Sequence, residues 1–248
     1  SDQPHGTHIN NVSFSVHAGE ILAIAGIAGN GQIELMGALS GEIGPPRSGS
    51  IRMLDTEAGA LTPVARRQLG AVFVPEERIG QAAVSDLNLV QNSFLTSADR
   101  LGFVSHGLVN WTQVEHYAQE ILQRFDVKAA GTAALANSLS GGNLQKFIVG
   151  REILQHPQLL VVSQPTWGVD AGAAAAIHEQ IQRLVGAGAG ALIISQDLDE
   201  IFALCDRIAV ISQGTLSEPQ LASDITTQEV GLLMGTSRNR TESSHAGA

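Results

Sequence analysis

The chain has 248 residues, of which 44% are hydrophobic and only 15% charged, and it carries 27 glycines. This length can bury a sizeable core, and the composition suits a globular domain with many tight turns. A net charge of −10 argues against a nucleic-acid groove, which needs clustered Lys and Arg. The single cysteine, Cys205, excludes an internal disulfide framework, and we expect it to be buried.

The N-terminal segment, SDQPHGTHIN, is polar and has no secretory signal. His5 and His8 have the spacing of metal ligands, but no acidic or cysteine ligand accompanies them, so we predict no metal site there. No apolar run in the chain approaches the ~20 residues of a membrane span. These features predict a cytoplasmic domain.

Short apolar segments alternate with helix-like ones along the chain, which predicts an α/β fold. Residues 12–16 alternate apolar and polar side chains, as a half-buried strand does. Five further segments are short and apolar, with β-branched residues, and read as buried strands: 21–25, 71–74, 159–162, 191–195 and 207–212. We expect them to form a mostly parallel sheet.

An insertion interrupts this alternation between the strands at 71–74 and 159–162. From roughly residue 78 to residue 137 the residue pattern differs from that of the flanking segments. We expect a helical subdomain at about 78–150 within a domain of 1–235. After Asn110, a candidate N-cap, apolar residues recur at helical spacing: Trp111, Val114, Ala118, Ile121, Leu122 and Phe125. The tail 236–248, TSRNRTESSHAGA, is polar, and we expect it to be disordered.

The segment 26–33, GIAGNGQI, lies between an apolar run and the helix-like residues 34–41. A strand, a glycine-rich turn and a helix in that order are the context of a phosphate-binding loop. The template G-x-x-x-x-G-K-[ST] requires Lys and then Ser or Thr, but Gln32 and Ile33 stand at these positions. The residues leave open whether this phosphate loop (26–33) hydrolyses nucleotide, only binds it, or is a structural turn.

The segment 139–146, LSGGNLQK, is the second informative motif, and we call it the signature segment. Ser140 can cap a helix that begins at about Asn143. Gly141 and Gly142 let backbone N–H groups approach an anion without an intervening side chain. The alternative is an ordinary helix N-cap after a glycine turn.

The phosphate loop, the helical insertion, LSGG and an apolar strand ending in QPTWGVD follow one another in the order of an ABC-type ATPase. From about residue 12 to 234 the chain resembles an ABC transporter nucleotide-binding domain. GNGQ-x-EL at 29–35, VPEER at 74–78 and Asn143 followed by Gln145-Lys146 resemble, more narrowly, the C-terminal half of the duplicated ATPase subunits of carbohydrate and nucleoside importers. QPT in place of EPT resembles the nucleoside branch in particular.

The resemblance implies a P-loop NTPase-like α/β domain with a mostly parallel central sheet, an antiparallel β portion near the N-terminus and the inserted helical subdomain. It also implies a set of nucleotide-binding positions: Gly26, Gly29, Asn30, Gly31, Gln32, Ile33, Glu76, Ser140, Gly141, Gly142 and Asn143. Among them Glu76 replaces the glutamine that senses the γ-phosphate. An adenine-stacking aromatic is also missing, because no aromatic residue precedes Phe14.

Five catalytic positions of the family carry other residues. Gln32 replaces the loop lysine, Ile33 the magnesium-binding hydroxyl, Ser163 the magnesium-holding aspartate, Gln164 the catalytic glutamate and Gln196 the switch histidine. Loss of a general base alone costs ~10²–10⁴ in rate. We therefore predict no hydrolysis and no bound magnesium at this site, with weak ATP binding left open because backbone N–H groups and the helix dipole survive side-chain changes.

The signature segment keeps Ser140, Gly141 and Gly142. In ABC dimers it closes over nucleotide held by the other domain, so we predict that it completes an ATP site on a partner. The resemblance implies two kinds of partner, an N-terminal ABC domain of the same subunit and transmembrane permease subunits, and a place on the inner face of the cell membrane. Two alternatives are an active ATPase with atypical catalytic residues and a soluble ABC protein outside transport.

Four acidic residues near the strand ends also have structural interpretations. Asp197, Asp199 and Glu200 surround a predicted helix start, where we expect them to favour the helix dipole rather than bind a metal. Asp170 resembles an aspartate that communicates across ABC dimers, and it can also cap the helix that follows. Trp167 stands where the family often has Arg.

Overall fold

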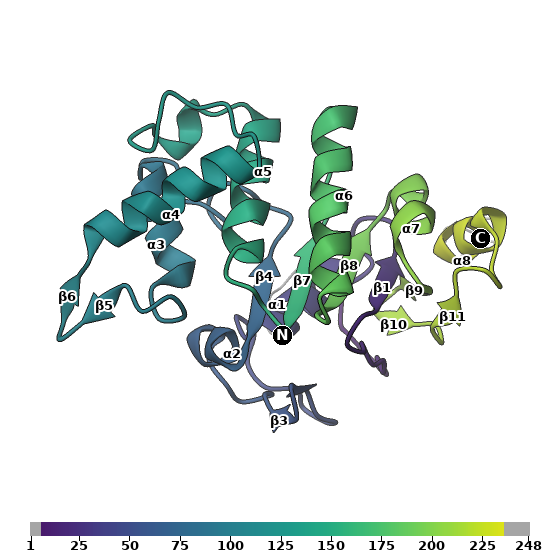
Figure 1. The fold of residues 1–248 in the computed structure, drawn as a ribbon. Coiled ribbons are helices and arrows are strands. Elements are labelled where there is room, and N and C mark those ends of the chain that lie inside the picture. Colours follow the sequence, from purple (N-terminus) through teal and green to yellow (C-terminus); the bar gives the residue numbers. More distant parts are fainter. Residues whose placement is uncertain (1–5, 236–248) are drawn as a thin grey trace, which may run out of the picture.

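The computed structural model describes residues 6–235, so His5 and the tail 236–248 lie outside the described range. Its main sheet has seven strands, with β10, β9, β1, β8, β7 and β4 in that order and β11 also paired with β9 (Figure 1). Five of these strands run parallel: β4 (Ala71–Val74), β7 (Leu159–Ser163), β8 (Gly190–Ser195), β1 (Ile21–Ala25) and β9 (Arg207–Ser212). The five predicted apolar strands are present, which confirms the mostly parallel α/β sheet.

Both faces of this sheet are buried. Successive side chains of a strand point to opposite faces, so each strand contributes to a hydrophobic cluster on either side. In β1, Ile21, Ala23 and Ala25 join the larger hydrophobic cluster with the long helices, whereas Leu22 and Ile24 join a second cluster. That second cluster includes Leu35 and Met36 of α1 (Gln32–Ser40). Burial on both faces explains why the strands are continuous apolar runs.

Three helices of the inserted segment pack together beside the sheet: α3 (Leu89–Ser97), α4 (Trp111–Arg124) and α5 (Gly141–Ile153) (Figure 1). The segment also contains a hairpin of β5 (Val104–Ser105) and β6 (Leu108–Val109), which we did not predict. Asn110 caps α4 as predicted, because its side chain accepts a hydrogen bond of 3.2 Å from the Gln113 N–H. The domain limits of 1–235 stay a prediction.

The remaining elements form two groups, one on the face of the second hydrophobic cluster and one on the face of the larger cluster and beyond β9. The first group is α2 (Pro63–Leu69) and a hairpin of β2 (Arg52–Met53) and β3 (Thr56–Glu57). The second is α6 (Ala171–Gly186), α7 (Leu198–Leu204), β10 (Thr215–Leu216), β11 (Gln220–Leu221) and α8 (Thr227–Gly235). A 3-10 turn, Ala136–Ser138, belongs to the inserted segment and lies just before α5. Within residues 6–235, no helix has the length and apolar character needed to cross a membrane.

A buried ionic cluster fixes α5 to the rest of the domain. Glu152, whose side chain is fully buried, accepts hydrogen bonds from Arg67 (2.6 Å), Arg151 (2.9 Å) and Thr96 (2.8 Å). Burial alone would raise the pKa of Glu152, but the Arg67 and Arg151 guanidinium groups outweigh that effect and lower it. The helix that begins at the signature segment is therefore held by a charged carboxylate near its other end.

The predicted strand at 12–16 is wrong. These residues keep the alternation of the prediction, because Val12, Phe14 and Val16 pack against the second cluster, but they pair with no strand. Packing one face of an extended segment satisfies its apolar side chains and does not require a hydrogen-bond ladder. The antiparallel portion before β4 is therefore the short β2–β3 hairpin.

Trp111 also departs from the prediction, because its side chain is 49% exposed rather than buried with the other apolar residues of α4. It lies against Phe94 of α3, with ring centroids 5.2 Å apart. The remaining residues of the predicted face, from Val114 to Phe125, are buried. Cys205 is buried as predicted, and burial raises the pKa of its thiol.

Candidate functional site

The carboxyl ends of the parallel strands bring the predicted catalytic positions to one edge of the sheet, the usual place of ligand sites in open α/β sheets. The phosphate loop follows β1, Gln164 follows β7 and Gln196 follows β8. Backbone hydrogen bonds join them: Gly26 N–H donates to Ser195 O at 3.3 Å, and Gln164 N–H donates to Ile194 O at 2.8 Å. The sequence prediction that these segments share one site is consistent with this geometry.

Gln32, at the position of the family's lysine, turns into its own loop and is only 7% exposed. Its Oε1 accepts the Asn30 N–H at 3.0 Å, and its Nε2 donates to Ile27 O at 2.8 Å. A Cβ atom on Gly26 would lie 2.8 Å from this Nε2. The carboxamide thus takes up a backbone donor that an anion in this loop would use.

Asn30 and Thr7 tie the phosphate loop to other parts of the chain. Asn30 accepts the Gln213 N–H at its side-chain oxygen and the Gly214 N–H at its carbonyl, both at 2.9 Å. Thr7 donates its hydroxyl to Gly29 O, and its N–H reaches the Glu34 carboxylate, both at 2.8 Å. The loop is therefore braced by the 6–10 segment and by the turn after β9.

The helix that follows the loop begins without a side-chain cap. Its N-cap residue is Gly31, in a left-handed conformation with φ of 112°. A Cβ atom there would lie 2.8 Å from Ile9 Cδ1, so both the backbone conformation and the close approach of the 6–10 segment favour glycine.

The two positions that the resemblance assigns to magnesium binding carry residues other than the expected ligands. Ile33 has no ligand atom, and its side chain is 67% exposed. Ser163 is buried and offers a neutral hydroxyl in place of a carboxylate. Magnesium prefers charged oxygen ligands in a near-octahedral arrangement, so this pair does not fit the ion.

Gln164, at the position of the family's general base, adopts a left-handed backbone conformation with φ of 51°. Such a conformation is uncommon for residues other than glycine and is found at functional turns. A carboxamide can orient a water molecule but cannot take its proton at neutral pH. Gln196 is half-buried, and Glu76 is exposed.

A buried carboxylate that we had assigned only to the helix dipole joins two of these segments. Glu200, 4% exposed, accepts hydrogen bonds from Thr166 Oγ1 (2.6 Å) and Ser195 Oγ (2.8 Å), and it lies 3.0 Å from His178 Nε2. The loop after β7 and the end of β8 are thereby held together. Asp197 caps α7, with its side chain accepting the Glu200 N–H at 3.2 Å, which confirms the helix-start interpretation.

The signature segment starts α5 with its first turn facing outward. Ser140 is exposed and caps the helix, because its Oγ accepts hydrogen bonds from the Asn143 N–H (3.4 Å) and Nδ2 (2.9 Å). Asn143 also accepts the Lys128 N–H at 2.8 Å. The helix begins at Gly141 rather than near Asn143, because the Ser140 cap allows the first turn to include both glycines.

Within the described residues, no hydrogen bond joins the signature segment to the phosphate loop of the same chain. The signature segment instead packs on the loop after β7, where a Cβ atom on Gly142 would lie 3.7 Å from Val169 Cβ. Asp170, in this loop, caps α6 as predicted, and the hydrogen bond from the Ala173 N–H lowers the pKa of its carboxyl.

Sequence reasoning missed the role of Gln145, which is 2% exposed. Its Nε2 donates to Pro165 O at 2.9 Å, and its Oε1 accepts the Arg78 Nε–H at 2.9 Å. A polar side chain between the apolar residues Leu144 and Phe147 was the available signal, because buried polar groups require hydrogen-bond partners.

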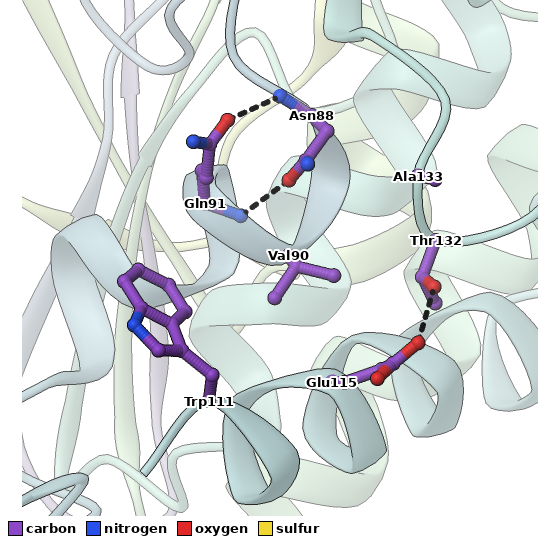
Figure 2. Close-up of a pocket in the computed structure, with 7 residues that line it drawn as sticks. All are labelled: Asn88, Val90, Gln91, Trp111, Glu115, Thr132 and Ala133. Carbon is purple, nitrogen blue, oxygen red and sulfur yellow. Dashed lines mark hydrogen bonds between the residues drawn. The ribbon is translucent and has the colours of Figure 1, made fainter. Parts of the chain in front are cut away.

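A cavity of about 340 Å³, lined by none of the predicted site residues, lies between the start of α3, the start of α4 and the chain at 132–133 (Figure 2). It is lined by Asn88, Val90, Gln91, Trp111, Glu115, Thr132 and Ala133. In Figure 2 the side chain of Gln91 is bonded to Asn88, and Glu115 to Thr132, so much of the polar lining is paired within the protein. No predicted nucleotide contact depends on this cavity.

Comparison with known proteins places the chain among nucleotide-binding domains. The nucleoside import ATP-binding protein NupA of Lactococcus lactis is 38% identical over 226 residues, which cover 91% of this chain and 44% of NupA. The ribose import ATP-binding protein RbsA 2 of Rhizobium meliloti is 30% identical over 246 residues, 97% of this chain and 48% of that protein. The chain therefore spans less than half the length of these relatives.

Solved structures agree on the fold. The dimeric ATP-binding cassette MJ0796, in a post-hydrolysis state with ADP and Pi, superposes with a TM-score of 0.73 at 20% identity, over 86% of this chain and 90% of that one. The profile of the ABC transporter family matches residues 9–167. Together with the strand order and the signature segment, this match shows that the chain belongs to the ABC transporter family.

Proposed function

We propose that this chain is a nucleotide-binding domain of an ABC importer for nucleosides or sugars, that it does not hydrolyse ATP at its own site, and that it donates its signature segment to the active site of a partner domain. The observation that carries the proposal is the contrast between the two glycine-rich helix starts. Gln32 is folded into the phosphate loop, whereas Ser140 is exposed at the start of α5.

At the domain's own site, nucleotide competes with the Gln32 side chain for a backbone N–H group of the phosphate loop. A phosphate that uses the Asn30 N–H must displace the Gln32 carboxamide and its two hydrogen bonds. Ile33 and Ser163 do not fit magnesium, so this ion takes no part in the chemistry of the loop. Binding of ATP at this loop is therefore weak and depends little on magnesium.

At the partner's site, the signature segment supplies donors. The backbone N–H groups of the first turn of α5 and the helix dipole favour an anion placed against it. The Ser140 hydroxyl accepts two hydrogen bonds from Asn143, which leaves its own hydrogen free to be donated across an interface. Such fixed donors stabilise charge on a γ-phosphate without reorganisation.

The proposed partners follow from the relatives. NupA and RbsA 2 are named as import ATP-binding proteins, and each is more than twice as long as the part that this chain matches. We infer that the partner domain is an N-terminal ABC domain of the same subunit, that permease subunits complete the transporter, and that the domain works at the cytoplasmic face of the membrane.

The decisive experiment measures ATP hydrolysis and solute uptake in the assembled transporter with Gly142→Asp and Gln32→Ala made separately. Gly142→Asp places a carboxylate against the partner's phosphate and abolishes both activities, because like charges out of water repel strongly. Gln32→Ala leaves both activities within a few-fold of wild type. Gly142→Ala is the matched control, since a Cβ atom there makes an ordinary contact with Val169. The proposal is wrong if Gly142→Asp retains turnover while Gln32→Ala abolishes it.

A second measurement tests the alternative of an active ATPase with atypical residues. The chain alone should give no ATP turnover above background. A magnesium-dependent steady rate of ~1 s⁻¹ or more, an ordinary enzyme value, that disappears on changing Gly31 would establish that alternative instead.

A further inference from the structure

Arg78 joins three segments that meet at the signature segment. From the end of the VPEER sequence after β4, its Nε donates to Gln145 Oε1 on α5 at 2.9 Å, and its Nη2 donates to the carbonyl oxygen of Trp167 in the loop after β7. Gln145 in turn donates to Pro165 O at 2.9 Å. Together these hydrogen bonds link α5, which begins at the signature segment, to the loop after β7.

The Arg78 guanidinium also occupies a space in which two neighbouring residues have no side chain. A Cβ atom on Gly141 would lie 2.8 Å from Arg78 Nη1, and one on Gly168 would lie 3.3 Å from Nη2. Gly168 also has a left-handed backbone, with φ of 65°. The guanidinium therefore lies between a glycine of the signature segment and a glycine of the WGVD sequence.

The loop that carries Arg78 is itself fixed. The Arg78 carbonyl accepts the Ala83 N–H at 2.7 Å, and the Ala82 carbonyl accepts a hydrogen bond of 2.8 Å from the buried Arg151 of α5. Burial lowers the pKa of Arg78, but an arginine stays protonated in proteins. Arg78 is thus a charged, planar group with fixed partners on two elements.

We propose that Arg78 is a positioning residue for the site that the signature segment completes: its guanidinium holds the first turn of α5 and residues 165–170 as one surface, so that both meet the partner's nucleotide together. This inference rests on the proposed function. Only a forked group can bond Gln145 and Trp167 at once while filling the space between the two glycines. Lysine has the charge but not the fork.

The kinetic test compares Arg78→Lys and Arg78→Gln in the assembled transporter. Both variants should lower the kcat of ATP hydrolysis by about 10- to 100-fold, the cost of misplacing a site by about 1 Å, with the KM for ATP within about threefold of wild type. Arg124→Lys, on the exposed side of α4, is the matched control and should change neither constant. Wild-type turnover of Arg78→Lys would overturn the proposal, because charge alone would then suffice.

A local readout separates this inference from the proposed function. In the chain with Trp111→Phe, Trp167 is the single tryptophan, and its side chain is 56% exposed. Both Arg78 variants should lower the fluorescence anisotropy of Trp167 and raise its quenching by acrylamide at temperatures well below unfolding, which thermal melts establish for each variant. Unchanged anisotropy in both would overturn the proposal. If Gly142→Asp has no effect on the transporter, the proposed function fails, and this measurement still decides whether Arg78 holds the loop.

Discussion

The two glycine-rich helix starts of this domain differ in what their first turns offer to a ligand. At α1, the N-cap is Gly31, the Asn30 N–H is bonded to Gln32, and the 6–10 segment packs against the loop. At α5, Ser140 caps the helix, and its first turn faces outward above Arg78. Both are helix N-termini with glycines in or beside the first turn, so the surrounding side chains decide which one can serve an anion.

The comparison teaches that a phosphate loop with glutamine at the lysine position can satisfy one of its backbone donors internally. Buried polar groups without partners are costly, so a loop without a lysine at this position needs another way to satisfy its backbone. Gln32 provides it with one donor and one acceptor. The signature segment has no such need, because its first turn is open to water.

The largest expected effect comes from removing the anchor of α5. Glu152→Ala leaves Arg67 and Arg151 without their buried partner and should lower the free energy of unfolding by about 3–5 kcal/mol, as measured by urea denaturation. Glu179→Ala removes an exposed pair with Arg183 and should change it by less than about 1 kcal/mol. Equal effects of the two variants would contradict the assigned role of the cluster.

The pH dependence of the free energy of unfolding tests the role of Glu152 in a second way. Because the pKa of folded Glu152 lies below its ordinary value of 4.5, its ionised form stabilises the fold above that pH, and this stabilisation is lost as the pH falls through the folded pKa. The difference in unfolding free energy between wild type and Glu152→Gln should be constant near neutrality and shrink below about pH 4.5. A difference that grows on acidification would show the opposite sign of the pKa shift.

Placing the family's residues at positions 32 and 33 should remove the difference between the phosphate loop and the signature segment as anion-binding helix starts. Wild type should bind ATP weakly with little magnesium dependence. The double variant Gln32→Lys, Ile33→Ser should bind ATP about tenfold more tightly, and its binding should depend on magnesium. The reason is that a charged donor and an oxygen ligand are added. Calorimetry measures both, with Gln32→Met as the control that frees the loop without adding charge. Tight, strongly magnesium-dependent binding by wild type would refute our interpretation of this site.

The smallest expected effect concerns the cap of α5. Ser140→Ala removes the hydrogen bonds from Asn143 and should cost about 1 kcal/mol of stability, whereas Ser140→Thr should retain most of it. Thermal unfolding of the three proteins is sufficient to measure this. A cost as large as that of Glu152→Ala would mean that Ser140 supports the fold rather than a site.

The strands and the helix caps could be predicted because their causes are local. Apolar runs such as Ile21–Ala25 fix buried strands, and Ser140, Asp170 and Asn110 each cap a helix within three residues of their own position. The segment 12–16 shows the limit of such patterns. Alternation predicts a buried face but not whether a second strand stands close enough to pair.

The contacts that define the candidate site were not predictable, because they join residues far apart in sequence. Thr7 reaches the phosphate loop, Arg78 reaches Trp167, and Glu200 reaches Thr166. No periodicity or local propensity reports such pairs. Even Gln32, whose partners are near, required the folded loop to show that its carboxamide turns inward.

The sequence by itself determined the order of strands and helices, the two glycine-rich motifs and the substitutions at the catalytic positions, because covalent order and local periodicity encode them. The tertiary structure alone decided that the Gln32 side chain hydrogen-bonds within the phosphate loop. It also decided that Arg78 hydrogen-bonds to both α5 and the loop after β7. Hydrogen bonds of this kind depend on side-chain direction and on the approach of distant elements. Both arise only when the sheet has brought the ends of its strands to one edge.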